Sequence, residues 1–277
     1  MRFMVWHETH YRYSAPVAFA EHILRLTPRE DNAILNVHRL IIDPAPRVRQ
    51  DLTDRYGNTL TQLDFEGLSC HLRIDSYFEL DKLAPAASSH PPLPRLPWHH
   101  GAKDAMADYL PPPQDQDESV RTFAAGLASE SGWDAPSFLA RLNQTLFTRT
   151  NRHIRPEGAA QTPAYTLAAA KGACRDITTL FIAACRSLGI PSRFLSGYQA
   201  HAETPDGRRH LHAWPEVFLP GAGWQGFDPT HGLPVTDGHV ALCAAPDQAA
   251  TMPVEGGFFG DGVTSTLNYE VRIVSEP

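Results

Sequence analysis

Cys174 is the residue whose type and position could carry covalent chemistry. It follows Gly172 and Ala173 and begins the most regular amphipathic segment of the sequence, which ends at Gly189. A thiol at a helix N-terminus is favoured as its thiolate by the helix dipole and by nearby N–H groups. Because the thiolate is the nucleophile, this position suits acyl transfer from an amide or peptide bond.

A base and an orienting carboxylate for this nucleophile occur downstream. His212 lies in a predicted strand over residues 211–219, and Asp228 directly follows another over 224–227, with a turn at 220–223 between them. On neighbouring antiparallel strands, a carboxylate can hold the imidazole tautomer that proton transfer requires. The three residue types therefore predict a thiol, imidazole and carboxylate triad.

The register of these two strands decides whether His212 and Asp228 lie on the same face of the sheet. Direct pairing of Leu219 with Trp224 would put Asp228 on the opposite face of the sheet from His212. We therefore expect either a loop of odd length or a bulge, for which Pro215 is a candidate because it cannot donate to the ladder.

The elements that must position these residues fall into an α+β arrangement of two domains. Residues 1–83 show short strands separated by turns, which predicts a β-sandwich-like domain. Residues 84–114 are rich in proline and predict a connector or an extended strap over the surface. Residues 115–277 predict helices first and an antiparallel sheet afterwards, with a loop over 152–171 and a last strand over 267–275.

Motifs in both domains resemble bacterial transglutaminase-like proteins, a superfamily with a papain-like fold. The core motifs are GACRD at 172–176, RSLGIPSRFLSGY at 186–198, HAWPEV at 212–217 and GWQGFDPT at 223–230. The motifs of the family's N-terminal β region are HETHYRY at 7–13, LRLTPR at 24–29 and DRYGN at 54–58. Because these motifs occur in order, they identify the family far more specifically than any one of them.

The resemblance implies a role for each of the three residues. Cys174 would be the nucleophile, His212 the general base and acid, and Asp228 the carboxylate that orients the imidazole. The implied reaction forms a thioester from an amide, which an amine or water then resolves. The implied partners are thus a peptide or amide-bearing substrate and, in the transferase case, an amine acceptor.

Several other residues are candidates for supporting roles. The backbone N–H of Cys174 is the expected first oxyanion donor. Tyr165 is a candidate for the second donor or for the cleft, and Trp214 for the cleft wall or the core. Asp176 could contact the site from behind, or could simply be a favourable acid in the first helical turn. His210 is a rival base, because it shares the strand face of His212.

The main alternatives are a cysteine protease that acts on small peptides and a non-catalytic binding or scaffold module. The fourteen histidines raise the question of a metal, but apart from the His210 and His212 pair they lack ligand spacing, so we expect neither a metal nor another cofactor.

Composition narrows the function classes further. The formal net charge of −7 argues against binding to the phosphate backbone of nucleic acids, and the sequence has no apolar run of about 18 residues that would span a membrane. Four scattered cysteines do not form a disulfide framework, and the first residues do not resemble a secretory signal. We therefore expect a cytoplasmic protein; the sequence defines no oligomeric state.

Overall fold

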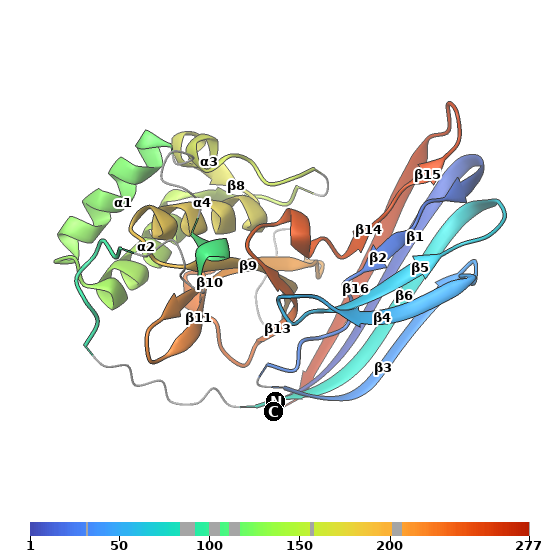
Figure 1. Cartoon of the computed structure of the whole chain (residues 1–277), viewed down its shortest axis with the longest axis horizontal. Coiled ribbons are helices and arrows are strands. Elements are labelled where there is room, and N and C mark those ends of the chain that lie inside the picture. Colours follow the sequence, from blue (N-terminus) through green and yellow to red (C-terminus); the bar gives the residue numbers. More distant parts are fainter. Residues whose placement is uncertain are drawn as a thin grey trace.

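The computed structural model shows a β-rich unit and an α/β unit side by side (Figure 1). It describes residues 1–31, 33–83, 92–99, 106–110, 117–155, 158–200 and 207–276. The expectation of an α+β fold with a papain-like core, helices followed by an antiparallel sheet, is confirmed.

The β-rich unit contains two antiparallel sheets. One has the order β15-β1-β6-β3, with β16 also paired to β1, and the other has the order β14-β2-β5-β4. The strands are β1 (Arg2–Phe19), β2 (His22–Leu24), β3 (Ala33–Asp43), β4 (Val48–Thr53), β5 (Thr59–Asp64), β6 (Ser69–Lys82), β14 (Val254–Glu255), β15 (Phe258–Phe259) and β16 (Ser265–Glu276). Their core alternates along each strand, as in Leu72, Ile74, Phe78 and Leu80 of β6, which are fully buried.

The last strand corrects one expectation of the sequence analysis, which groups it with the second domain. In the structure β16 pairs with β1 along its whole length, from Arg2 opposite Glu276 to Tyr13 opposite Ser265. Its Val271 is buried in the core of the β-rich unit. The alternation of a segment predicts that it forms a strand but not with which strand it pairs. Here one edge of β1 pairs with β16 over all of residues 265–276.

The α/β unit packs four helices against one face of an antiparallel sheet of order β12-β11-β10-β9-β13 (Figure 1). The helices are α1 (Glu118–Glu130), α2 (Ala135–Arg149), α3 (Pro163–Ala169) and α4 (Cys174–Ser187). The strands are β9 (Ser192–Gln199), β10 (His212–Leu219), β11 (Gly223–Asp228), β12 (Leu233–Pro234) and β13 (His239–Ala245). Short elements complete the unit: η1 (Ala107–Tyr109), β7 (Asn151–Arg152), β8 (Lys171–Gly172) and η3 (Ala249–Thr251).

Helix α4 occupies the centre of the helical core. Its apolar stripe is buried throughout, at Ile177, Leu180, Phe181, Ala184 and, just after the helix, Leu188. The chain then turns at Gly189, whose φ is 76° and where a Cβ atom would lie 2.1 Å from the carbonyl oxygen of Trp98. Only glycine fits that position, so the end of the helix is fixed by the segment that passes over it.

That segment belongs to the proline-rich connector. Within residues 92–99, Leu96 is buried among the helices, and the backbone N–H of Trp98 donates to Leu188 at 2.9 Å. This stretch contains no helix or strand and lies across the helical core, while the parts of 84–114 outside 92–99 and 106–110 lie outside the described residues.

Helix α3 lies where the sequence analysis expects only loop. The Thr162 side chain caps it by accepting a hydrogen bond from the backbone N–H of Tyr165, and Pro163 is its first residue. Pro163 begins this helix and does not break it, because proline is favoured at the first helical position, where its missing N–H would have no partner in any case.

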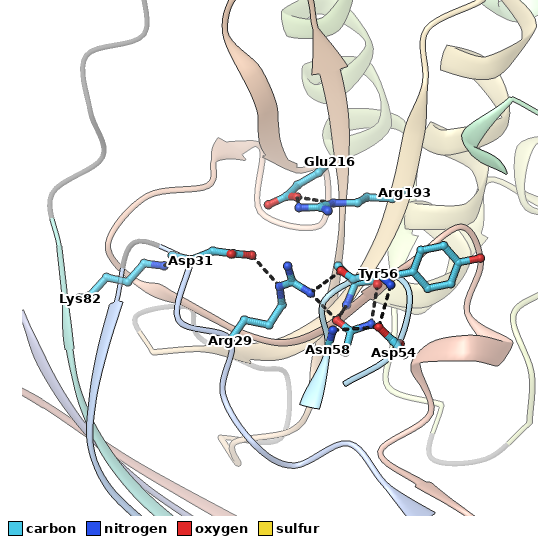
Figure 2. A network of polar contacts seen from close by, with 9 residues as sticks. Arg29, Asp31, Asp54, Tyr56, Asn58, Lys82, Arg193 and Glu216 are labelled. Carbon is cyan, nitrogen blue, oxygen red and sulfur yellow. Dashed lines mark hydrogen bonds and ion pairs between the residues drawn. The ribbon is translucent and has the colours of Figure 1, made fainter. Parts of the chain in front are cut away.

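The two units share buried contacts. Tyr198 of β9 and Val240 and Leu242 of β13 are buried in the same core as the first β sheet. Figure 2 shows the polar part of this junction, where Arg29 lies between Asp31 and the turn at residues 54–58.

We call the group of Arg29, Asp54 and Asn58, with the backbone of Ala241 and Ala244 to which they bond, the junction network. The fully buried Asn58 amide donates to the Ala244 carbonyl at 2.9 Å and accepts from its N–H at 2.8 Å. Asn58 also donates to Asp54, and the Arg29 backbone N–H donates to Ala241 at 2.9 Å. These bonds tie the β-rich unit to β13.

Among the described residues, no helix combines the length and the apolar character needed to cross a membrane. The cytoplasmic location stays a prediction.

Candidate active site

The structure brings Cys174, His212 and Asp228 together. Cys174 is the first residue of α4 and is partly exposed, while His212 begins β10 and Asp228 ends β11. Nε2 of His212 lies 2.8 Å from Oδ2 of the fully buried Asp228. His212 also lies close enough to Cys174 to lower the pKa of the thiol, and the His212 nitrogen that Asp228 does not use is Nδ1. The three groups thus form one continuous chain from sulfur to carboxylate.

The turn between β10 and β11 resolves the register problem. Leu219 pairs with Gly223, so the loop has three residues, and the ladder continues to Glu216 opposite Gly226. Extended by two residues, this register sets Asp228 across from Trp214, on the same face as His212. The loop of odd length is therefore correct. Pro215 forms no bulge, because it pairs with Phe194 in an unshifted β9–β10 register.

Asp176 fixes the backbone in front of the cysteine. Its fully buried carboxylate accepts from the backbone N–H of Ala173 at 2.8 Å and of Gln161 at 2.8 Å, and it forms an ion pair with Arg155 at 2.5 Å. Asp176 is thus more than a favourable acid in the first turn. It caps α4 and ties the preceding loop to it, so that Cys174 is held at the helix start.

The electrostatics of the site favour a thiolate beside an imidazolium. Burial raises the pKa of the Cys174 thiol, but the hydrogen bond and charge of His212 and the Ala213 N–H outweigh it, so the pKa is lowered. Burial lowers the pKa of His212, but the Asp228 carboxylate and the Cys174 sulfur raise it to about 10. Both shifts favour the ion pair, in which the proton resides on the imidazole and not on the sulfur.

Asp228 also has partners that the sequence analysis did not single out. Oδ2 accepts from Nδ1 of His231 at 2.8 Å and from Nε2 of His239 at 3.0 Å, in addition to His212. Although burial opposes it, these imidazoles hold the pKa of the Asp228 carboxyl well below its usual range. The only signal in the sequence was the spacing of three residues from Asp228 to His231; nothing marked His239.

The other candidates lie apart from this chain of contacts. The Tyr165 side chain is 58% exposed and its backbone N–H is used in the cap of α3, so nothing in its placement supports an oxyanion role. Trp214 is 1% exposed and stacks on His212 at a centroid distance of 5.9 Å, which makes it core and not cleft wall. His210 bonds instead to the Tyr269 hydroxyl at 2.9 Å.

One group of described residues has the composition of a metal site. The ligand atoms of His212, Asp228 and His231 lie within 4.8 Å of one another. They are already hydrogen-bonded through Asp228, and a metal there would replace the proton that His212 shares with it. Metal binding and the triad are therefore competing uses of the same atoms, and the absence of a metal stays a prediction.

Both units match known families. Residues 121–229 match the model of the transglutaminase-like superfamily, and residues 3–81 match that of the bacterial transglutaminase-like N-terminal region. The chain therefore contains a transglutaminase-like core region and, before it, the N-terminal region of bacterial transglutaminase-like proteins. The resemblance seen in the sequence motifs is confirmed.

Similar chains span nearly all of the protein. The uncharacterized protein Rv2569c of Mycobacterium tuberculosis is 28% identical over 302 residues, which cover 99% of this chain and 92% of the relative. The uncharacterized protein ML0607 of Mycobacterium leprae is 26% identical over 278 residues, covering 95% of each. A crystal structure from Cytophaga hutchinsonii, described as a "putative cysteine protease", has a TM-score of 0.68 at 18% identity and covers 100% of this chain and 92% of that one. That likeness establishes the shared fold.

Proposed function

We propose that the protein is a thiol-dependent acyltransferase that cleaves an amide or peptide bond through a thioester on Cys174. The observation that carries this proposal is the continuous chain from the partly exposed Cys174 through His212 to the buried Asp228. The lowered pKa of the thiol and the raised pKa of the imidazole support it, because they favour the thiolate, which is the nucleophile, and the imidazolium, which is the acid.

In the first half of the reaction, the thiolate attacks the substrate carbonyl carbon. A C–S bond forms, and the carbonyl oxygen takes the electron pair as an oxyanion. The backbone N–H of Cys174 lies in the first turn of α4, where N–H groups have no intrahelical acceptor, and it donates to this oxygen. When the C–N bond breaks, the His212 imidazolium gives its proton to the departing nitrogen, which leaves as an amine or ammonia.

In the second half, the acceptor resolves the thioester. Neutral His212 removes a proton from water or from an amine, which attacks the thioester carbon. The C–S bond breaks, and the site returns to thiolate and imidazolium. Asp228 keeps its contact with Nε2 of His212 throughout, so the ring presents Nδ1 to the sulfur and to the reacting groups.

The decisive experiment is capture of the acyl-enzyme. Full-length protein is incubated with candidate glutamine-containing and other small peptides, quenched in acid and examined by intact mass. We expect a mass increase equal to the acyl group, and no increase in Cys174→Ala. The matched control is Cys70→Ser, because Cys70 is the exposed thiol of the β-rich unit and should not affect capture.

The same samples distinguish the acceptor and test the non-catalytic alternative. Incorporation of a labelled primary amine identifies a transferase, whereas release of ammonia or peptide without incorporation identifies a hydrolase. A scaffold would give no adduct with any peptide and no selective alkylation of Cys174 over Cys185 and Cys243, both of which are buried. That combined result would end the proposal.

A further inference from the structure

Three imidazoles converge on one carboxylate oxygen of the candidate active site. Oδ2 of Asp228 is within hydrogen-bond distance of Nε2 of His212 (2.8 Å), Nδ1 of His231 (2.8 Å) and Nε2 of His239 (3.0 Å). Orientation of the catalytic histidine requires only the first of these bonds. The other two contacts, one buried and one partly buried, therefore need their own explanation.

His231 reaches the carboxylate through a tight turn after β11. The backbone N–H groups of Thr230 and His231 donate to Oδ1 of Asp228 at 3.0 and 3.2 Å, which curls the chain back over the carboxylate. This turn places the His231 ring over Oδ2. Arg152 donates to the Thr230 carbonyl of this turn, and its guanidinium lies over the Phe147 ring.

His239 reaches the same oxygen from β13, the strand at the opposite edge of the sheet from β12. It begins β13, is 2% exposed, and lies edge-on to Trp214 at a centroid distance of 5.2 Å. The rings of His212, Trp214 and His239 thus pack against one another, with centroids 5.2 to 6.3 Å apart. The indole fits there because β9 has a glycine, Gly197, beside it: a Cβ atom at this position would be 2.7 Å from the indole.

We propose that His231 and His239 are positioning residues of the reaction: they hold Oδ2 of Asp228 ionised and pointed at His212. An ionised carboxylate is acceptor-only, so each imidazole must present an N–H to it. His239 does so with Nε2 while its Nδ1 lies buried without a hydrogen-bond partner, a cost that a purely structural histidine would have no reason to bear. With donors on three sides, the carboxylate cannot rotate away when His212 releases its proton.

The proposal gives the β-rich unit a part in the site. The junction network binds β13 at Ala241 and Ala244, and these positions flank a register shift in the pairing of β13 with β9. The strand that carries His239 is thus fixed by the β-rich unit at one end and bonded to Asp228 at the other.

The test exploits the different nitrogen that each histidine uses. A glutamine amide reproduces an Nε2 donor and an asparagine amide reproduces an Nδ1 donor. In a Cys70→Ser background we would compare His239→Leu with His239→Gln, and His231→Leu with His231→Asn. The readouts are the rate of Cys174 alkylation by iodoacetamide against pH, thiolate absorbance, and kcat and KM on any amide substrate found.

We expect the leucine variants to shift the acid limb of alkylation to higher pH and to lower kcat by about 10- to 100-fold with little change in KM. His239→Gln and His231→Asn should recover most of the loss. The matched control is His71→Leu, which removes an imidazole–carboxylate contact of the same kind, with Asp43 at 2.9 Å, on the exposed β-rich sheet.

The inference rests on the proposed function, but alkylation needs no substrate, so the two can fail separately. Leucine variants that fold, as judged by circular dichroism and Tm, and that keep the wild-type alkylation profile would overturn it. So would equal losses in the leucine and amide variants, because that pattern would mean that ring packing matters and donation does not. If the histidine variants shift Cys174 alkylation as expected but no amide substrate is turned over, the proposed function alone would be rejected.

Discussion

Strand β13 connects two buried polar clusters that are built from different chemistry. At its start, His239 joins Cys174, His212 and Asp228, all of which carry groups that can exchange protons. Towards its end, Ala244 exchanges two hydrogen bonds with the Asn58 amide, whose donor and acceptor pattern does not change with pH. The first cluster can move protons, and the second can only hold two pieces of backbone together. Burial alone therefore does not identify the reactive site.

The largest effect should come from removing the shared acceptor. Asp228→Ala leaves the imidazoles of His212, His231 and His239 without their common partner, and His212 loses the charge that raises its pKa. We expect kcat/KM to fall by about 10³-fold or more. Single-turnover kinetics on folded protein would measure the fall; a loss below tenfold would mean that the carboxylate does not orient the base.

The junction network should respond in stability and not in chemistry. Asn58→Ala leaves the Ala244 N–H and carbonyl and the Asp54 carboxylate short of partners, which should cost about 2–4 kcal/mol in the free energy of unfolding. Urea denaturation measures this, with the exposed Asn36→Ala, which removes a contact to Asp81, as the control.

The alkylation profile of Cys174 in Asn58→Ala sharpens the comparison. An unchanged profile in the folded variant would keep the two clusters separate. A shift like that of His239→Leu would show that the two clusters are coupled through β13, and the distinction between a reactive and a structural cluster would fail.

The smallest perturbation is a change of pH without any mutation. Both alkylation and acyl transfer should fall on the acid side, because Cys174 becomes protonated below its lowered pKa. On the alkaline side the rates of alkylation and of acyl transfer should differ. The raised pKa of His212 means that its proton is lost only as the pH passes about 10, where acyl transfer should decline by about tenfold per unit while the thiolate continues to alkylate. Parallel pH–rate profiles test this, and alkaline limbs that coincide would contradict it.

Local signals predicted the parts of the fold that depend on nearby residues. The stripe of α4 and the alternation of β6 followed from spacing alone, and the parity argument required the odd loop that separates Leu219 from Gly223. The sequence missed α3, because a proline starts a helix as readily as it breaks one.

Contacts between distant segments were beyond that reasoning. His239 meets Asp228 only because β13 returns beside β9, and β16 finds β1 across more than 250 residues. Neither contact can be predicted from local spacing. Only the structure therefore shows that further histidines surround Asp228 and that β16 completes the sheet of the β-rich unit.

The pairing of β16 with β1 has a consequence for how the protein is made. Figure 1 shows the two marked ends of the chain next to each other, although the paired residues are more than 250 positions apart in the sequence. Until residues 265–276 leave the ribosome, one long edge of β1 has no partner, and an open edge of that kind readily pairs with other chains. A nascent chain that stalls before residues 265–276 would thus expose an unpaired strand edge, even though Cys174, His212 and Asp228 have already been synthesised.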